Sequence, residues 1–261
     1  MAENAVPVTG TDRSGDDDLG IVVGTDGSEI SYQAVAWAAV EAQTRGCPLR
    51  IVASYANPIV PGALELGPDD MRDLRAQGQQ VLADAARIAL HAVPGESLRL
   101  STELIFDMIT TALIDRSRRA RLLVVGNRGQ GAIRRAVLGS VSTVVARQAH
   151  CPVAVVHGVA ETDPESVSKP VVVGVDGSPN SAPAIEFAFE EASRRKVDLI
   201  AVHAWNDTTG FDLPVVGWES IRKTEDVLLG SVSTALLHLA RCPVLVVRQA
   251  VETRVEEPTG Q

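Results

Sequence analysis

Aromatic residues are scarce in this chain and make up 3% of its 261 residues. A core with few aromatic side chains has to be built from Ala, Val, Leu and Ile, and this composition suits helices packed on a buried parallel sheet. Hydrophobic residues account for 45% of the chain and charged residues for 22%, as in an ordinary globular protein. The length is enough for one or two domains with a substantial core.

Cysteine is also rare, and the chain contains only Cys47, Cys151 and Cys242. Their spacing is not that of metal ligands, and an odd number does not suggest a disulfide framework. We therefore expect three reduced thiols that are buried as small apolar residues.

Long hydrophobic runs and an excess of positive charge are absent. No apolar stretch approaches the roughly 18 residues of a membrane-spanning helix, and the amino terminus has neither the basic nor the apolar region of a signal peptide. The formal net charge of −9 disfavours non-specific binding to nucleic acid or anionic lipid. We expect a cytoplasmic protein with no membrane span and no nucleic-acid partner.

The chain does contain an internal repeat. The sequence GIVVGTDGS at 20–28 returns as PVVVGVDGS at 170–178, a shift of 150 residues. The segments 31–46 and 49–56 match 181–196 and 199–206 at the same shift. Such self-similarity indicates a duplicated structural unit.

Hydrophobic periodicity in the first copy alternates between strands and helices. We expect strands at 21–25, 50–54, 98–105, 122–125 and 153–156, helices at 31–45, 69–91, 109–117 and 140–148, and a loop at 57–68. This order predicts an α/β fold, a five-stranded parallel sheet with helices on both faces. Ligands of such sheets bind beyond the carboxyl ends of the strands, where the strand order reverses.

The loop between the fourth strand and the fourth helix carries the clearest functional signal. It places glycines at 126, 129, 131 and 139, where a missing Cβ would let the backbone approach a ligand closely. The helix that follows would begin with the free N–H groups of Ser140, Val141 and Ser142, which form a ready anion site. The loop therefore predicts a site for phosphate.

Two better-known phosphate motifs do not fit this loop. A Walker loop needs Lys-Ser or Lys-Thr after its last glycine, and the dinucleotide fingerprint needs glycines spaced G-x-G-x-x-G. The loop instead has the pattern G-x(2)-G-x(9)-G-S over residues 126–140. Its three arginines, Arg128, Arg134 and Arg135, can add positive charge, although solvated surface charge is the simpler interpretation of the last two.

The second copy is shorter than the first. The sequence VLGSVSTVVARQAHCPVAVV at 137–156 matches LLGSVSTALLHLARCPVLVV at 228–247 at a shift of 91, so 59 residues are missing from the second copy. We expect the missing piece to include the glycine loop, so that nothing corresponds to Gly126 or Gly129. Asp176 and the Gly230-Ser231 helix start remain, so we expect this copy to keep only one wall of such a site.

The second copy should form three strands, at 171–175, 199–204 and 244–247. A unit of about 80 residues is marginal alone, so we expect it to pack against the first copy. The expected domains are a flexible tail at 1–18, a complete unit at 19–160, a truncated unit at 168–250 and a tail at 251–261.

The combination of VVGTDGS, LLVVGNRGQG, nine residues between Gly129 and Gly139, GSVS and CPVAVV resembles the universal stress protein family in its tandem, ATP-binding form. The resemblance covers about 19–157 in full and 170–248 with the middle missing. It implies the family's nucleotide-binding fold, an ATP ligand together with Mg²⁺, a homodimer, and joining of the two halves through the edge at 153–156. In the family's strand order, loss of the fourth strand would leave the second copy with either a gap or a sheet closed up in the order two, one, five. Its last strand can also pair with its counterpart at 153–156, and we expect no ATP binding by this copy alone.

The resemblance also implies which residues bind ATP. Those for adenine and ribose are Asp26 and the backbone around Thr25 and Val52. Those for ribose and phosphates are Gly126, Arg128 and Gly129, and those that cradle the phosphates are Gly139, Ser140, Val141 and Ser142. Asn127 departs from the family, which often has serine at this place.

Purely structural roles stay open for several of these residues. Asp26, followed by Gly-Ser, can form a turn and a helix cap, and Ser140 and Ser142 can be caps alone. His150 and His157 are interpreted as structural, because no Ser-His-Asp or Cys-His arrangement is evident.

Two functions of different classes follow from the sequence. The first is an ATP-binding sensor or regulator of a stress response, with one nucleotide per chain and an unidentified protein partner. Its hydrolysis would be slow at most, because no base is placed to activate water. The second is a scaffold or dimerisation protein that no longer responds to nucleotide. Nucleotidyl transfer is disfavoured, since no His-x-Gly-His motif occurs.

Overall fold

The computed structural model describes residues 20–55, 67–94, 98–129, 139–158, 168–175, 181–203, 236–238, 240 and 242–247. The expected tails at 1–18 and 251–261 lie outside the described residues. So do most of the expected loop at 57–68 and the nine residues between Gly129 and Gly139.

The first copy forms the expected five-stranded parallel sheet. Its strands are β1 Ile21–Gly24, β2 Leu49–Ser54, β3 Leu100–Ile105, β4 Leu122–Gly126 and β5 Val153–Val156. They lie in the order β3-β2-β1-β4-β5, and each neighbouring pair is parallel. The chain runs from β1 outward to β3 and then crosses to β4, so the strand order reverses between β1 and β4.

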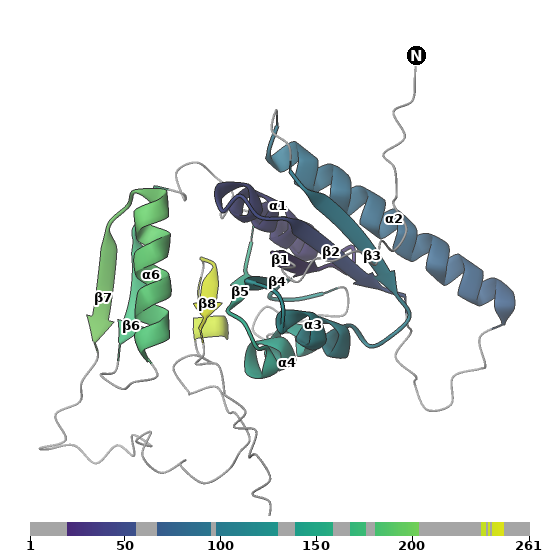
Figure 1. Cartoon of the computed structure of the whole chain (residues 1–261). Helices are drawn as coiled ribbons and strands as arrows, with labels where there is room; N and C mark the ends of the chain where they lie inside the picture. The colour runs from purple at the N-terminus through teal and green to yellow at the C-terminus, as the bar shows by residue number, and fades with distance from the viewer. Residues whose placement is uncertain are drawn as a thin grey trace, which may run out of the picture.

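Helices cover both faces of this sheet (Figure 1). They are α1 Glu29–Thr44, α2 Pro68–Ala92, α3 Ile109–Ser117 and α4 Ser140–Gln148. Alternate residues of β1 separate two cores: Ile21 and Val23 pack with α1 and α2, whereas Val22 packs with α3 and α4. This alternation follows from the two-residue period of a strand. The fold class predicted from the sequence is confirmed.

Helix starts follow local capping chemistry. Ser28 is the N-cap of α1, and its hydroxyl accepts a hydrogen bond from the N–H of Ser31. α2 begins at Pro68, one residue earlier than expected, because proline suits the first helical position. No helix within the described ranges is both long enough and apolar enough to cross a membrane.

The second copy contributes two separate pieces. β6 Val171–Val175 and β7 Leu199–His203 form a parallel pair, joined by α6 Ala182–Arg195. β8 Val244–Val246 instead pairs antiparallel with β5 and becomes the sixth strand of the first sheet. The expected pairing with 153–156 is therefore confirmed. A closed-up sheet in the order two, one, five is not what the described strands form.

The pairing of β5 with β8 is symmetric. Ala154 lies opposite Leu245, its own counterpart at the shift of 91, and the neighbouring valines pair reciprocally on either side. An antiparallel pairing of equivalent residues is the signature of a two-fold axis, here within one chain. His157, at the end of β5, adds a 2.8 Å hydrogen bond from Nε2 to the carbonyl oxygen of Leu237 in the second copy.

A second contact between the copies obeys the same symmetry. Glu41 of α1 and Glu191 of α6 are counterparts at the shift of 150, and both are buried. Arg45 donates to Glu191 at 2.6 Å, and its counterpart Arg195 donates to Glu41 at 2.8 Å. Arg194 pairs with both glutamates. We call these five residues the charge clasp.

Candidate functional site

The candidate site lies where β1 and β4 end side by side, at the point of strand-order reversal. Thr25 and Asp26 follow β1, and the glycine loop follows β4. The carboxyl ends of adjacent parallel strands meet at one edge of a sheet, so the two segments predicted from the sequence are neighbours in the structure.

Gly129 is placed directly against Asp26. A Cβ built on Gly129 would overlap the carboxylate oxygen Oδ2 of Asp26. The close approach, rather than an unusual backbone angle, is what requires glycine here. The loop therefore presents bare backbone beside a carboxylate, which is the arrangement expected of a ligand cradle.

The two ends of the loop are held together by the backbone. The N–H of Gly139 donates to the carbonyl oxygen of Asn127 at 2.7 Å, and the N–H of Asn127 donates to Val156 at the end of β5 at 2.8 Å. A Cβ on Gly139 would lie 3.3 Å from the oxygen of Asn127. A Cβ on Gly126 would lie 2.9 Å from a methyl carbon of Ile30. Both glycines thus fit tight places at the base of the loop.

The amino terminus of α4 lies at the same place. Its N-cap is Gly139, which has no side chain to cap the first turn, and the N–H of Thr143 makes the first helical bond to Gly139 at 3.0 Å. The N–H groups of the first three residues, Ser140, Val141 and Ser142, are not used by the helix itself. They form the positive end of a nine-residue helix beside the cradle.

The hydroxyl of Ser142 is used for hydrogen bonds within the protein. Its hydroxyl is 1% exposed and donates to the carbonyl oxygens of Gly139 at 3.0 Å and Asn127 at 3.3 Å. Only its backbone N–H can face a ligand. Ser140, by contrast, is exposed.

Thr25 and Val52 are tied into the sheet. The N–H of Thr25 donates to the carbonyl oxygen of Val52 at 3.0 Å, and the hydroxyl of Thr25 lies 2.9 Å from that of Ser31. The side chain of Val52 is fully buried in the core with α3 and α4. These two residues shape the floor of the site.

Asp26 divides its two oxygens between a turn and the loop. Oδ1 accepts a 3.0 Å hydrogen bond from the N–H of Ser28, as the turn interpretation required. Oδ2 faces Gly129, and the role of Asp26 in binding a ligand stays a prediction. The cap of α1 is Ser28 rather than Asp26.

Asn127 was not selected from the sequence as a site residue. It is 8% exposed, and its side-chain oxygen Oδ1 has no hydrogen-bond partner in the described part of the chain. Arg128 is half-buried beside it, whereas Arg134 and Arg135 lie outside the described residues. Among the described residues, no group of three His, Cys, Asp or Glu side chains is arranged to hold a metal ion.

Comparison with known proteins identifies the family. The model of the universal stress protein family matches residues 20–157, 168–211 and 206–248. The chain belongs to the universal stress protein family. The repeated match also confirms the tandem arrangement.

One relative and two solved structures illustrate what the chain is similar to. Universal stress protein Rv2005c of Mycobacterium tuberculosis is 34% identical over 293 residues, which span 88% of this chain and 97% of that protein. The crystal structure of a universal stress protein from Archaeoglobus fulgidus DSM 4304 matches 88% of this chain and 98% of that chain, with a TM-score of 0.64 and 17% identity. At this identity the similarity shows the fold alone. A universal stress protein solved in complex with cAMP is 30% identical and covers 53% of this chain and 95% of its own, with a TM-score of 0.40.

The third family match corrects our expectation for the second copy. It begins at residue 206, well before the position where the repeat was expected to resume. Extended backward at the shift of 91, LPVVG at 213–217 aligns with LLVVG at 122–126, so Gly217 does correspond to Gly126. Ser220 stands where the first copy has Gly129, and Glu219 where it has Arg128.

The 59 missing residues therefore precede this segment. They are the counterparts of α2, β3 and most of α3. Asp176, residues 213–220 and the Gly230-Ser231 pair all lie outside the described residues.

Proposed function

We propose that the first copy binds one adenine nucleotide, ATP with Mg²⁺, in the cradle between Asp26 and the glycine loop. The observation that carries this proposal is the contact of Gly129 with the Asp26 carboxylate beside the open amino terminus of α4. A phosphate chain needs bare backbone and several N–H donors at one place, and these residues supply both.

Each residue would have a defined task. The N–H groups of Ser140, Val141 and Ser142 would bind phosphate oxygens, and Arg128 would add positive charge. Asp26, with the backbone around Thr25 and Val52, would hold the ribose and adenine. Asp26 is also a carboxylate of the kind that binds Mg²⁺, which would offset the repulsion between Asp26 and the phosphates.

The second copy would not bind nucleotide. In the first copy a Cβ at position 129 would overlap the aspartate, and Ser220 brings such a Cβ at the corresponding position. Glu219 replaces the positive charge of Arg128 with a negative one. We therefore expect one nucleotide per chain.

On this basis we propose that the protein is a cytoplasmic, nucleotide-dependent sensor or regulator of a stress response. Occupancy of the cradle would change the surface offered to a protein partner at the amino terminus of α4. A nucleotide-independent scaffold is the second candidate, favoured by the charge clasp, in which side chains of the two copies bond directly to each other.

Substitution of Gly129 tests the site directly. Gly129→Ala should weaken ATP binding about tenfold or more, a loss of about 1.4 kcal/mol, because the new methyl group meets the Asp26 carboxylate. The fold should survive, since the overlapping atom is the end of a side chain. Titration calorimetry with and without Mg²⁺ measures the affinity and the stoichiometry.

Gly158→Ala is the matched control, because a Cβ there meets nothing within 4 Å. Unchanged ATP affinity in the Gly129→Ala protein would remove the site assignment. If the wild-type protein binds no ATP, carries no nucleotide when purified from its host, and shows no rise in melting temperature with ATP, the scaffold function is the correct one.

A further inference from the structure

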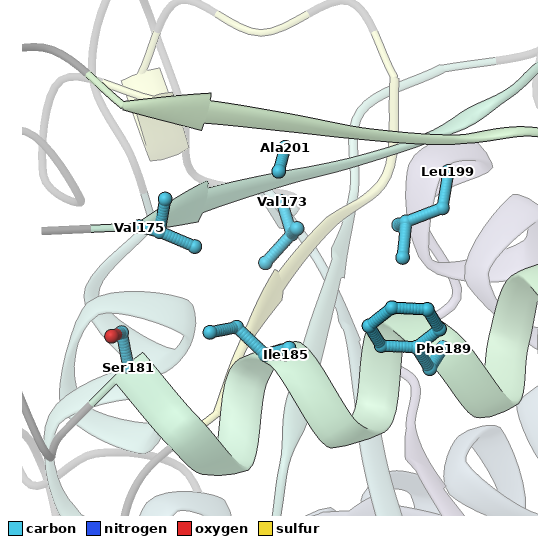
Figure 2. A pocket seen from close by; sticks show the side chains of 7 residues that line it. All are labelled: Val173, Val175, Ser181, Ile185, Phe189, Leu199 and Ala201. Atoms are coloured by element: carbon cyan, nitrogen blue, oxygen red, sulfur yellow. The ribbon is translucent and has the colours of Figure 1, made fainter. Parts of the chain in front are cut away.

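The second copy contains an open apolar groove between its helix and its sheet. The groove has a volume of about 520 Å³. Figure 2 shows Ile185 and Phe189 of α6 pointing toward Val173 of β6 and Leu199 of β7, with Ala201 alongside. We call these five residues the α6 groove. Phe189 is 62% exposed, which is unusual for a large aromatic side chain in a helix that covers a sheet.

The same surface is closed in the first copy. At the shift of 150, the α6 groove residues correspond to Val23, Val35, Ala39, Leu49 and Ile51. All five are fully buried, in one cluster with Leu82, Ala85 and Ala89 of α2. The helix that covers this surface in the first copy is therefore α2, which lies beside α1 (Figure 1).

The second copy has no residues that correspond to α2, because they belong to the missing 59. The α6 groove thus corresponds to the surface that α2 covers in the first copy, and the second copy has no counterpart of α2. Along α6 it runs from Ser181 to Phe189, which is about 12 Å or two helical turns. That length suits a helix laid into a groove, one of the recurring modes of peptide recognition.

Charge at the rim indicates what kind of helix fits. Tyr32 and Val40 of α1 pack against the cluster that contains Leu82, Ala85 and Ala89 of α2, and Ala36 lies between them on the same side of the helix. Burial together with Asp84 of α2 raises the pKa of Tyr32. The counterparts of these three α1 residues include Glu186 and Glu190, both exposed on the corresponding side of α6. The half-buried Ala36 and Val40 have thus been replaced by carboxylates.

We propose that the α6 groove binds a basic amphipathic helix of a partner protein. The apolar stripe of that helix would carry small and aliphatic residues, as α2 does, with small ones opposite the bulky Phe189. Lysine or arginine on its flanks would pair with Glu186 and Glu190. The proposal does not depend on nucleotide binding by the first copy.

The probe is a synthetic 25-residue helix that keeps the buried residues of α2, namely Gly78, Leu82, Ala85, Ala86 and Ala89. One version carries lysine at the exposed positions, and a matched version carries glutamate. Fluorescence anisotropy with the full-length protein should show the lysine helix binding at least about tenfold more tightly than the glutamate helix. The double variant Glu186→Lys, Glu190→Lys should reverse this preference.

A second pair of variants separates the groove from general attraction to an acidic protein. Ala201→Glu adds a charge in the groove, and Val202→Glu adds the same charge on the opposite face of β7, where Val202 is 49% exposed. Ala201→Glu should weaken binding of the lysine helix about tenfold, and Val202→Glu should leave it nearly unchanged. Absence of binding, as when the chain's own residues fill the groove, would overturn the proposal. Equal affinity of the Ala201→Glu and Val202→Glu proteins for the lysine helix would also overturn the proposal.

Discussion

At the scale of single residues, the candidate site depends on one missing Cβ: Gly129 can lie against Asp26 because it has no side chain. The sequence selected both residues, from a glycine pattern and from a strand that ends in Asp-Gly-Ser. It could not show that they touch, because 102 residues separate them along the chain and only the sheet order brings them together. Ser142 was selected for its backbone N–H, and only the structure shows that its hydroxyl donates to two carbonyl oxygens inside the protein.

The three cysteines differ in their exposure to solvent. Cys47 and Cys151 are buried as expected, but Cys242 is exposed, so the expectation was wrong for one of the three. Cys151 packs in a core that contains Leu113 of α3. The counterpart of Leu113 is among the residues missing from the second copy, so Cys242, the counterpart of Cys151, lacks that cover.

Thiol reactivity should follow this difference. Burial raises the pKa of Cys151 to about 12, so its thiol stays protonated at ordinary pH and is a poor nucleophile. Iodoacetamide at pH 8 should label Cys242 at least about tenfold faster than Cys47 or Cys151 in the folded protein, as followed by peptide mass spectrometry. In denaturant the three rates should converge. Early labelling of Cys151 in the folded state would contradict the burial described here.

At the scale of elements, α3 is attached to the sheet by charge as well as by packing. Arg116 of α3 donates to Glu103 of β3 at 3.0 Å through Nε and again through its terminal nitrogen, and Arg50 of β2 lies 3.5 Å from the same carboxylate. Burial alone would raise the pKa of Glu103, but the two arginines outweigh it and hold that pKa below its usual value. These ion pairs link β2 and β3 to α3.

The stability that Glu103 provides should depend on pH. Because its pKa is lowered in the folded state, the stabilisation is fully present above the unfolded-state pKa of about 4.3 and is lost as pH falls through the folded-state value. Glu103→Gln should lower the free energy of unfolding at pH 7 by on the order of 1 kcal/mol. Urea titrations from pH 7 to pH 3 should show wild type and variant converging at the acid end. A difference that grew toward low pH would contradict the assignment.

At the scale of the whole molecule, the two copies are joined as if they were the halves of a dimer. β8 pairs with β5 around Ala154, and the charge clasp links α1 to α6 by reciprocal bonds. The edge of β5 is therefore already used within the chain. The homodimer that the family resemblance implied stays a prediction, and it would require a different surface from this one.

Breaking the charge clasp should loosen the whole molecule. Glu191→Ala leaves Glu41 as the one carboxylate of the charge clasp for Arg45, Arg194 and Arg195, and removing one partner of a buried ion pair costs about 3 kcal/mol. Limited proteolysis should then cut after residue 160 sooner than in wild type and leave the first copy intact. Glu190→Ala is the control, because Glu190 is adjacent to Glu191 but exposed. Its rate of proteolysis should resemble that of wild type. Equally fast cleavage of all three proteins would mean that the clasp does not hold the copies together.

The sequence by itself determined the elements, the repeat and the residue types of the site. Periodicity is a local property, and it predicted α3, α4, β5 and β6 with the bounds that the structure has. The tertiary structure decided which of these elements meet. It joined β8 to the first copy rather than to β6, because an unpaired strand edge takes the partner that satisfies its backbone groups. Among the described residues it also left the α6 groove uncovered, since the counterparts of α2 are missing from the second copy.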